Sequence, residues 1–355
     1  MKTDQHLDKN QIKQIIEEEY KIKILEFEFL PFGEVGYCYK VIGITLKEEK
    51  KKFFVKVFDQ TRLCKISSKN LTFSLKNLEI LRNDFSIKNI SRTVMNQKSE
   101  LETFSKDYRI VIFNYEEGES LDQNKYSNDQ IQELGRIIAS IHKSTPNLDL
   151  NGAPIEKFDL HFEGDLVRCF GYLDQMEKIG SNEFQKKVKE IIFPSKKMIM
   201  EQLKKAKETG ANLQAKYKEA SSFVFCHQDP VGSNIISRSK EGDLVIIDWD
   251  APTLAPREQD LWFFIDQHNF MDFLKSYQDI CPDFIGFDPL LIDFYMRKRI
   301  LEDITDWAFR ILFEKLPDIQ NVSDLNGLTR LMHEFDSLDN DIENFIRKIP
   351  RLLIK

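Results

Sequence analysis

The stretch Cys226–Asn234 brings a histidine, a carboxylate and an amide together at a spacing that could support chemistry. His227, Asp229 and Asn234 follow a short apolar run in the order H-x-D-x4-N, and Asp248 ends a later apolar run, nineteen residues after Asp229. The carboxylate of Asp229 can accept the proton of an attacking hydroxyl. Asn234 and Asp248 offer hard oxygen ligands, which Mg²⁺ prefers when it bridges nucleotide phosphates. The set therefore predicts phosphoryl transfer.

The spacing of these residues has a structural reason. Short apolar runs at 234–236 and 244–247 predict two strands, and the connection 237–243 is polar and contains glycine, as a hairpin turn does. A hairpin of these strands would bring Asn234 and Asp248 to the same end.

A lysine within an apolar strand lies upstream. Lys56 interrupts the run 52–58, and a turn containing Gly33 and Gly36 precedes it, with Gly36 twenty residues before the lysine. Taken singly, a strand lysine often reaches solvent along an apolar surface, and an aspartate after a strand is often a turn former. The ordered set of glycine turn, strand lysine, H-x-D-x4-N and strand-end aspartate favours a nucleotide-using site over these structural explanations.

The elements that must position these residues divide the chain into two parts. Apolar residues at helical spacing predict helices at 11–20 and 70–82. Strands are expected at 24–30, 37–44, 52–58, 90–95 and 108–113. From residue 127 the pattern is mainly helical, including 130–143 and a lysine-rich stretch at 183–218 that is broken at Pro194. We therefore expect an α+β fold with a small antiparallel sheet followed by a larger, mainly helical part.

These residues resemble the aminoglycoside phosphotransferase and choline kinase superfamily, which has the protein-kinase-like fold, and within it the spectinomycin phosphotransferases most closely. The resemblance is dense over Phe225–Asp229 and Ile246–Leu261, and weaker over Glu133–His142 and Arg299–Ile304. It implies a bilobal fold with a nucleotide-binding N-lobe at 1–113, a hinge at 114–118 and a helical C-lobe at 119–355. The C-lobe would contain the catalytic loop at 226–250 and the acceptor-binding helices.

The resemblance implies roles for the residues of the catalytic loop. Asp229 would be the catalytic base, and Asn234 and Asp248 would hold Mg²⁺. His227 would be structural and brace the loop. The superfamily commonly reads H-G-D-x-H-x-x-N here, whereas Gln228 and Val231 replace the glycine and the second histidine. Neither change removes a metal ligand or the base, so we expect activity to survive.

The resemblance also implies how the nucleotide would bind. Lys56 would contact the α- and β-phosphates of ATP, and the turn with Gly33 and Gly36 would cover them. Backbone groups of Asn114, Tyr115 and Glu116 would hydrogen-bond the purine. Glu79 is the candidate carboxylate partner of Lys56, although it lies far along its helix and a solvent-facing position is the alternative. GTP stays open as a donor.

Three classes of function fit such a site: a small-molecule kinase, a protein-directed kinase and an inactive nucleotide-binding scaffold. Protein kinases dock peptides on a long segment after the metal aspartate. Here Asp260 follows Asp248 by only twelve residues, which leaves no room for such a segment. An inactive scaffold predicts the loss of Asp229, Asn234 or Asp248, and all three are present. The sequence therefore favours a small-molecule kinase.

The charge distribution bears on the acceptor. The net charge is −7, and all of it lies after Asp250, where 12 Lys and Arg face 19 Asp and Glu. An acidic pocket would attract a cationic acceptor such as an aminoglycoside or an aminocyclitol like spectinomycin, which would imply a role in antibiotic resistance. The candidate acceptor-binding residues are Asp266, Glu302, Asp303 and Asp306. Salt bridges to Arg297, Lys298, Arg299 or Arg310 are the alternative for the last three, and choline, methylthioribose and homoserine-like acceptors stay open.

The composition excludes several other classes. The acidic balance argues against general nucleic-acid binding, which needs a basic surface, and no apolar run is long enough to span a bilayer. The first 20 residues lack the apolar region of a signal peptide. Five scattered cysteines without C-x-x-C spacing favour reduced thiols, and hence a cytoplasmic protein. The oligomeric state is not indicated.

Overall fold

The computed structural model describes residues 4–31, 36–60, 70–121, 126–239, 243–314 and 316–354. The chain forms two compact units, each made of separate stretches of sequence. The first unit comprises the described residues of 4–155 and 222–284, and the second comprises those of 156–221 and 285–354. The predicted lobe and hinge boundaries at 113 and 118 fall inside the first unit and stay a prediction.

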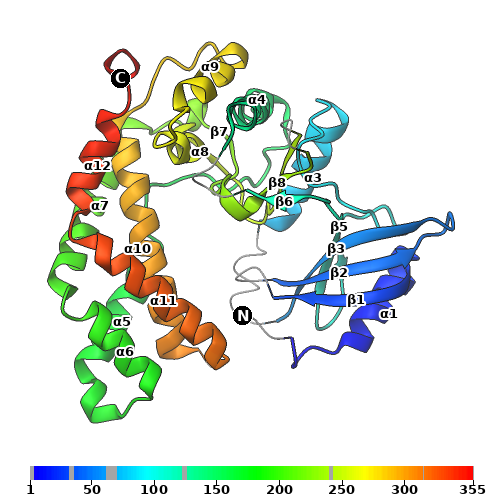
Figure 1. Cartoon of the computed structure of the whole chain (residues 1–355), viewed down its shortest axis with the longest axis horizontal. Helices are drawn as coiled ribbons and strands as arrows, with labels where there is room; N and C mark the ends of the chain where they lie inside the picture. Colours follow the sequence, from blue (N-terminus) through cyan, green and yellow to red (C-terminus); the bar gives the residue numbers. More distant parts are fainter. Residues whose placement is uncertain are drawn as a thin grey trace. The chain divides into compact units, whose positions relative to one another are not determined.

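The first unit begins with a five-stranded antiparallel sheet in the order β1-β2-β3-β5-β4 (Figure 1). Its strands are β1 (Lys23–Leu30), β2 (Tyr37–Ile44), β3 (Lys50–Phe58), β4 (Thr103–Phe104) and β5 (Arg109–Asn114). Two helices, α1 (Lys9–Tyr20) and α3 (Leu71–Asn83), contribute apolar side chains to its core. Alternating strand residues such as Tyr39, Val41, Val55 and Val57 are buried in that core, as the period of a strand requires.

The strand register fixes the position of Lys56. This residue lies in β3 between Cys38 of β2 and Val111 of β5, so it belongs to an interior strand of the sheet. Its side chain is only 8% exposed. A buried ammonium needs a charged partner. We therefore expect a carboxylate to lie against β3 at this position.

The remainder of the first unit is a helical core with short strands. Helices α4 (Asn128–Ser144) and α9 (Phe270–Ile280) pack against each other, with Gly135 against the backbone of Phe273, where a Cβ would come within 2.5 Å of the carbonyl oxygen. Strand β7 (Val224–Cys226) pairs with β10 (Thr253–Ala255). Strand β8 (Ile235–Ser237) pairs with β6 (Glu119–Ser120) and β9 (Leu244–Ile246), and the short helix α8 (Glu258–Leu261) follows β10.

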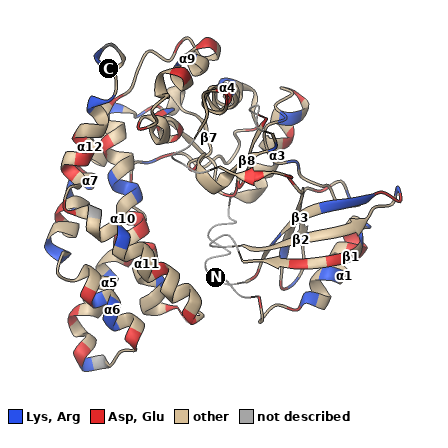
Figure 2. Ribbon diagram, viewed as in Figure 1, with Lys and Arg blue, Asp and Glu red and all other residues tan. Residues whose placement is uncertain are grey.

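The described residues of the second unit are mainly helical. It contains α5 (Glu163–Ile179), α6 (Glu183–Ile192), α7 (Lys196–Lys216), α10 (Pro289–Phe313), α11 (Asp318–Phe335) and α12 (Leu338–Arg347), together with a short 3₁₀ turn at Arg351–Leu353. Pro194 separates α6 from α7, as expected from its missing N–H. Basic and acidic residues are interspersed along these helices (Figure 2). A buried pair between Arg310 of α10 and Asp324 of α11, with two contacts of 2.9 Å, joins two of them.

The structure confirms the predicted α+β class with its small antiparallel sheet and larger helical part. One predicted strand, at 90–95, is wrong. Ile90 bridges to Ile246 and Thr93 bridges to Phe113, so this segment contacts two different elements one residue at a time and forms no ladder with either. None of the described helices is both long enough and apolar enough to cross a membrane.

Candidate active site

The loop between β7 and β8 holds Asp229 and Asn234 against each other. The side-chain amide of Asn234 donates to the Asp229 carboxylate Oδ2 at 2.9 Å and to the Asp229 carbonyl oxygen at 2.9 Å. These two bonds close the loop and use the amide nitrogen of Asn234. The amide oxygen of Asn234 is therefore the atom that can bind a cation. The predicted base and one predicted metal ligand are therefore neighbours.

The β8–β9 hairpin brings Asp248 to the same end of the site, as its spacing predicted. The Ile247 N–H donates to the Asn234 carbonyl oxygen at 2.9 Å, one residue beyond the Ile235–Ile246 pair of the ladder. Asp248 follows at once, in a left-handed conformation with φ of 66°. Its side chain is 40% exposed. A carboxylate and an amide oxygen at one hairpin end fit a hard divalent cation such as Mg²⁺.

Two carboxylates, not one, hold Lys56. Its Nζ lies 2.5 Å from Asp248 Oδ1 and 2.8 Å from Asp250 Oδ2. Burial alone would lower the pKa of Lys56, but the charges of the two aspartates outweigh it and raise the pKa above its ordinary value. Burial opposes ionisation of Asp248 as well, yet the adjacent Lys56 charge holds the pKa of this aspartate below its usual range. The lysine is therefore kept charged next to the predicted metal ligand.

The structure pairs Lys56 with Asp248 and Asp250 rather than with the expected partner, Glu79. Glu79 accepts a hydrogen bond from Asn83 of the same helix at 3.3 Å, and Lys56 donates to the two aspartates. The helix face that meets this site is that of Ser74, whose hydroxyl donates to the Trp249 carbonyl oxygen. Glu79 lies five residues further on, which is about 140° around an α-helix, so its side chain belongs to another face.

We expect Asp250→Asn to destabilise the protein and Glu79→Gln to leave its stability nearly unchanged. The first change removes a charged acceptor from the buried Lys56 ammonium, which costs about 1.5–3 kcal/mol of unfolding free energy. The second touches only a bond within α3 and should stay within about 0.5 kcal/mol. Chemical denaturation of both variants measures the difference. Equal losses would contradict the assignment of Asp250 as a partner of Lys56.

His227 is fully engaged in holding the loop. Its ring Nδ1 accepts the Asp229 N–H at 3.2 Å, so the ring proton lies on Nε2, which donates to the Ile247 carbonyl oxygen at 2.8 Å. The ring also meets Trp249 edge-on, with centroids 4.4 Å apart. Both nitrogens of this buried imidazole thus bond backbone groups, one in the loop after β7 and one directly after β9, an arrangement that supports the predicted bracing role.

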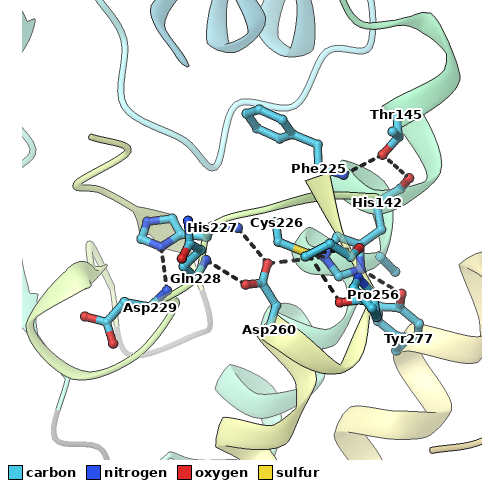
Figure 3. A network of polar contacts seen from close by, with 12 residues as sticks. His142, Thr145, Phe225, Cys226, His227, Gln228, Asp229, Pro256, Asp260 and Tyr277 are labelled. Carbon is cyan, nitrogen blue, oxygen red and sulfur yellow. Dashed lines mark hydrogen bonds and ion pairs between the residues drawn. The ribbon is translucent and has the colours of Figure 1, made fainter. Parts of the chain in front are cut away.

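Asp260 of α8 anchors the same loop from below. Its carboxylate accepts the backbone N–H groups of His227 and Gln228, each at 2.8 Å (Figure 3). Gln228 has a left-handed backbone with φ of 79°, a region that favours glycine. This explains why a glycine would suit the position. The Gln228 side chain donates to the Ala251 carbonyl oxygen and so connects the loop to the segment after Asp248.

The segment at 114–116 offers one backbone donor rather than three. The N–H of Asn114 donates to the Arg92 carbonyl at 2.8 Å, and that of Tyr115 donates to the Lys52 carbonyl at 3.2 Å. Within the described residues, the N–H of Glu116 has no backbone acceptor. The Glu116 side chain pairs with Arg238 at 2.5 Å. Of the three predicted purine contacts, the Glu116 N–H is thus the one whose donor is not used by the backbone.

Only part of the predicted phosphate-covering turn can be described. Gly33 lies outside the described residues. Gly36 packs against Phe58, whose ring would come within 3.1 Å of an added Cβ.

The predicted acceptor-binding carboxylates belong to both units. Asp266 is exposed in the first unit, whereas the other three residues lie on α10 in the second. Asp303 pairs with Arg299 at 3.3 Å, so the salt-bridge alternative holds for this residue. Glu302 instead contacts His161 at 3.1 Å, a partner that the sequence did not indicate. Asp306 is exposed on the same helix.

A titratable partner distinguishes Glu302 from Asp303. The hydrogen bond to Glu302 raises the pKa of His161, although burial opposes this. Burial in turn opposes ionisation of Glu302, but the bond to His161 outweighs it and lowers the pKa of Glu302. Histidine can lose its charge within the physiological pH range, whereas arginine cannot. A cationic ligand would therefore displace His161 from Glu302 more readily than Arg299 from Asp303.

The sequence reasoning missed two residues of this site, Asp250 and Asp260. Asp250 lies two residues after Asp248, and Asp260 lies twelve residues after it, directly before Leu261. Both fall within Ile246–Leu261, where the resemblance is dense, and that density was the available signal. Their partners, Lys56 and the loop backbone, lie far away in sequence, so spacing alone could not assign them.

The family model described as choline/ethanolamine kinase matches residues 85–284. This range includes the catalytic loop, Asp248, Asp250 and Asp260. A search of the curated proteins found no significant match.

Several solved structures share the fold over almost the whole chain. The spectinomycin phosphotransferase APH(9)-Ia, solved with ADP and spectinomycin, has a TM-score of 0.75 at 18% identity over 94% of this chain and 99% of its own. The amicoumacin kinase hAmiN, solved with AMP-PNP and Ca²⁺, has a TM-score of 0.57 at 12% identity, covering 94% of each chain. A microcompartment-associated aminopropanol kinase has a TM-score of 0.58 at 15% identity, covering 94% of this chain and 98% of its own. At these identities the likeness establishes the protein-kinase-like fold.

Proposed function

The chain belongs to the choline/ethanolamine kinase family and is a small-molecule kinase, and we propose that it transfers the γ-phosphate of Mg·ATP to a hydroxyl of a small cationic acceptor. One observation carries this proposal. The ion pair between Lys56 and Asp248 lies in the same unit as the hydrogen bond between Asn234 and Asp229. A cation to bind phosphates, a metal carboxylate and a base are thus present together, which phosphoryl transfer requires.

Each residue has a defined task in the proposed reaction. Asp229 accepts the proton of the acceptor hydroxyl, and Asn234 orients that carboxylate through its amide N–H. The oxygens of Asn234 and Asp248 would hold Mg²⁺, which when bound neutralises phosphate charge. Lys56 leaves the shared contact with the two aspartates and contacts the nucleotide phosphates. The Asp250 carboxylate stays close to the Lys56 ammonium and limits how far the lysine moves.

The segment at 114–116 and two of the similar structures support the proposed donor. The Glu116 N–H can donate to a purine, and the neighbouring side chains form fixed pairs, Lys52 with Glu117 and Glu116 with Arg238. Two of the similar structures were solved with ADP or AMP-PNP. We propose ATP as the donor, with GTP as the alternative that a donor screen resolves.

The acceptor is proposed to be small, hydroxylated and cationic. Only Ala251 and Pro252 separate Asp250 from β10, so the chain provides no long peptide-docking segment there. The excess of acidic residues in the last third of the chain favours a positively charged ligand. Spectinomycin and aminopropanol, after which two similar structures are named, define the range from antibiotic to amino alcohol that we propose to test.

A coupled assay of ATP consumption over a panel of acceptors tests this function. The panel contains spectinomycin and other aminocyclitols, amino-sugars, choline, ethanolamine, aminopropanol, methylthioribose, homoserine and a serine peptide. We expect turnover with one class of small cationic alcohol, and a KM for that acceptor that rises with salt because the attraction is screened. Selective use of the peptide, or of a neutral acceptor with a salt-independent KM, would overturn the proposal.

A further inference from the structure

We infer that Tyr277 and His142 are positioning residues for the catalytic loop, because they orient the Asp260 carboxylate that holds the backbone next to Asp229. This inference rests on the proposed function for its kinetic consequence, but not for its structural one. The three side chains come from α9, α4 and α8, and all belong to the first unit. Figure 3 shows Asp260 between the loop on one side and His142 on the other.

The Asp260 carboxylate receives three hydrogen bonds. Its Oδ2 accepts the His227 N–H at 2.8 Å and lies 3.2 Å from His142 Nε2, while its Oδ1 accepts the Gln228 N–H at 2.8 Å. The residue is only 2% exposed. An ionised carboxylate can only accept, so the facing nitrogen of His142 must carry the proton.

The direction of the next hydrogen bond follows from this proton. Burial lowers the pKa of His142, which keeps the ring neutral with a single N–H. Its Nδ1 is therefore an acceptor, and the Tyr277 hydroxyl, 2.8 Å away, must donate to it. Burial raises the pKa of Tyr277 far above its ordinary value, so this donor is retained. Tyr277, His142 and Asp260 thus form a directed chain that ends on the loop backbone.

Cys226 also lies near His142, and it suggests an alternative use of these groups. Its Sγ is 3.9 Å from His142 Nε2, and potential ligand atoms of His142, Cys226 and Asp260 all lie within 4.8 Å of one another, as in a metal site. The thiol is however 3.7 Å and 3.6 Å from the carbonyl oxygens of Ala255 and Pro256, to which it can donate. The hydrogen bonds account for every group, so we assign the cluster to positioning and make bound metal an outcome of the test.

The loop needs this anchor because Gln228 is held in an unfavourable conformation. A left-handed backbone is unfavourable for a residue other than glycine, and the bond from the Gln228 N–H to Asp260 opposes relaxation. Relaxation of Gln228 would rotate the following residue, Asp229. If the chain from Tyr277 orients Asp260, its loss should be felt at the base, and a glycine at position 228 should relieve it.

A double-mutant cycle between Tyr277→Phe and Gln228→Gly tests this link. We expect Tyr277→Phe alone to lower kcat about tenfold, with the KM for ATP changed less than about twofold. In the Gln228→Gly background, the same tyrosine change should lower kcat by less than about threefold, because glycine adopts the left-handed conformation without help. A tyrosine effect of equal size in both backgrounds would overturn the inference, since lost core packing is not rescued by a distant glycine.

Tyr20→Phe is the matched control. Tyr20 is also a buried phenol of the first unit, and its hydroxyl donates to the Ile110 carbonyl at 3.3 Å and accepts from Thr103 at 3.2 Å, within the sheet core. We expect its removal to lower the melting temperature without a matching loss of kcat. Equal losses of kcat in Tyr20→Phe and Tyr277→Phe would assign Tyr277 a general structural role and overturn the inference.

Amide hydrogen exchange provides a readout that does not depend on turnover. In Tyr277→Phe, exchange should accelerate in peptides covering Phe223–Asn234 and stay unchanged in peptides of β3, whereas Tyr20→Phe should show neither loop effect. If the wild type phosphorylates no acceptor, the proposed function fails, and the exchange result alone then decides the inference. Stoichiometric metal in the purified protein that is lost on Cys226→Ser would also overturn it.

Discussion

Asp229→Asn is expected to lower the rate of acceptor phosphorylation by about 10²–10⁴-fold, the usual contribution of a general base. The asparagine oxygen can still accept the Asn234 N–H that now contacts Asp229 Oδ2 at 2.9 Å, so the loop geometry should be kept. What is lost is the ability to take up a proton. Steady-state turnover and nucleotide binding by calorimetry together measure the effect, and the nucleotide affinity should change less than about twofold.

Asp107→Asn is the matched control for the same chemical change. Asp107 is exposed and accepts only a side-chain bond from Gln11, at 3.2 Å, among the hydrogen bonds described. This variant should keep wild-type turnover. Turnover of Asp229→Asn within about threefold of the wild type would remove Asp229 as the base, whatever the identity of the acceptor.

The sequence predicted the local part of this architecture well, because the signals are local. Alternation of apolar residues marked the strands that became β1, β2, β3 and β5, and helical spacing marked α3 and α4. The turn 237–243 and the apolar runs on either side were sufficient to predict the β8–β9 hairpin. The juxtaposition of Asn234 with Asp248 then followed from a ladder of three residue pairs.

The sequence could not predict which residue of a helix faces a distant strand. Glu79 has the chemistry of a lysine partner, but Ser74 is the residue of α3 that contacts the aspartate segment, at Trp249. The partners of Lys56 lie 192 and 194 residues away in the sequence, and they provide the carboxylates that Glu79 was expected to provide. Rotation of a helix about its axis depends on packing of its whole apolar face, which no short motif records.

The same limit applies to the support beneath the catalytic loop. His142 ends a helix that was predicted correctly, and Asp260 lies in a motif that the resemblance included. Their contact spans 118 residues, and the Tyr277 contact spans 135. A lone histidine on an apolar helix face is ordinarily explained as a core residue. Only the folded structure shows that the two ring nitrogens of His142 connect Tyr277 to Asp260.

Asp248→Ala is expected to remove the Mg²⁺-dependent part of nucleotide affinity. Asp248 is the only carboxylate of the predicted metal pair, and loss of a group that merely supports a metal ligand already costs about 10–100-fold in metal affinity. We therefore expect ATP affinity in excess Mg²⁺ to fall by at least about tenfold. Affinity for the free nucleotide in EDTA should change far less, and titration calorimetry under both conditions measures the two values. Unchanged Mg·ATP binding would remove Asp248 as a metal ligand.

The interpretation of this variant depends on a second substitution, because Asp248 has two other tasks. It shares the Lys56 ammonium with Asp250, and it occupies a left-handed conformation that asparagine tolerates better than alanine does. Asp248→Asn keeps the turn and an amide oxygen but loses the charge. If both variants lose the Mg²⁺-dependent affinity, the charge of Asp248 is the cause. If only Asp248→Ala loses it, the charge of Asp248 is not required, and an oxygen at position 248 or the backbone turn is sufficient.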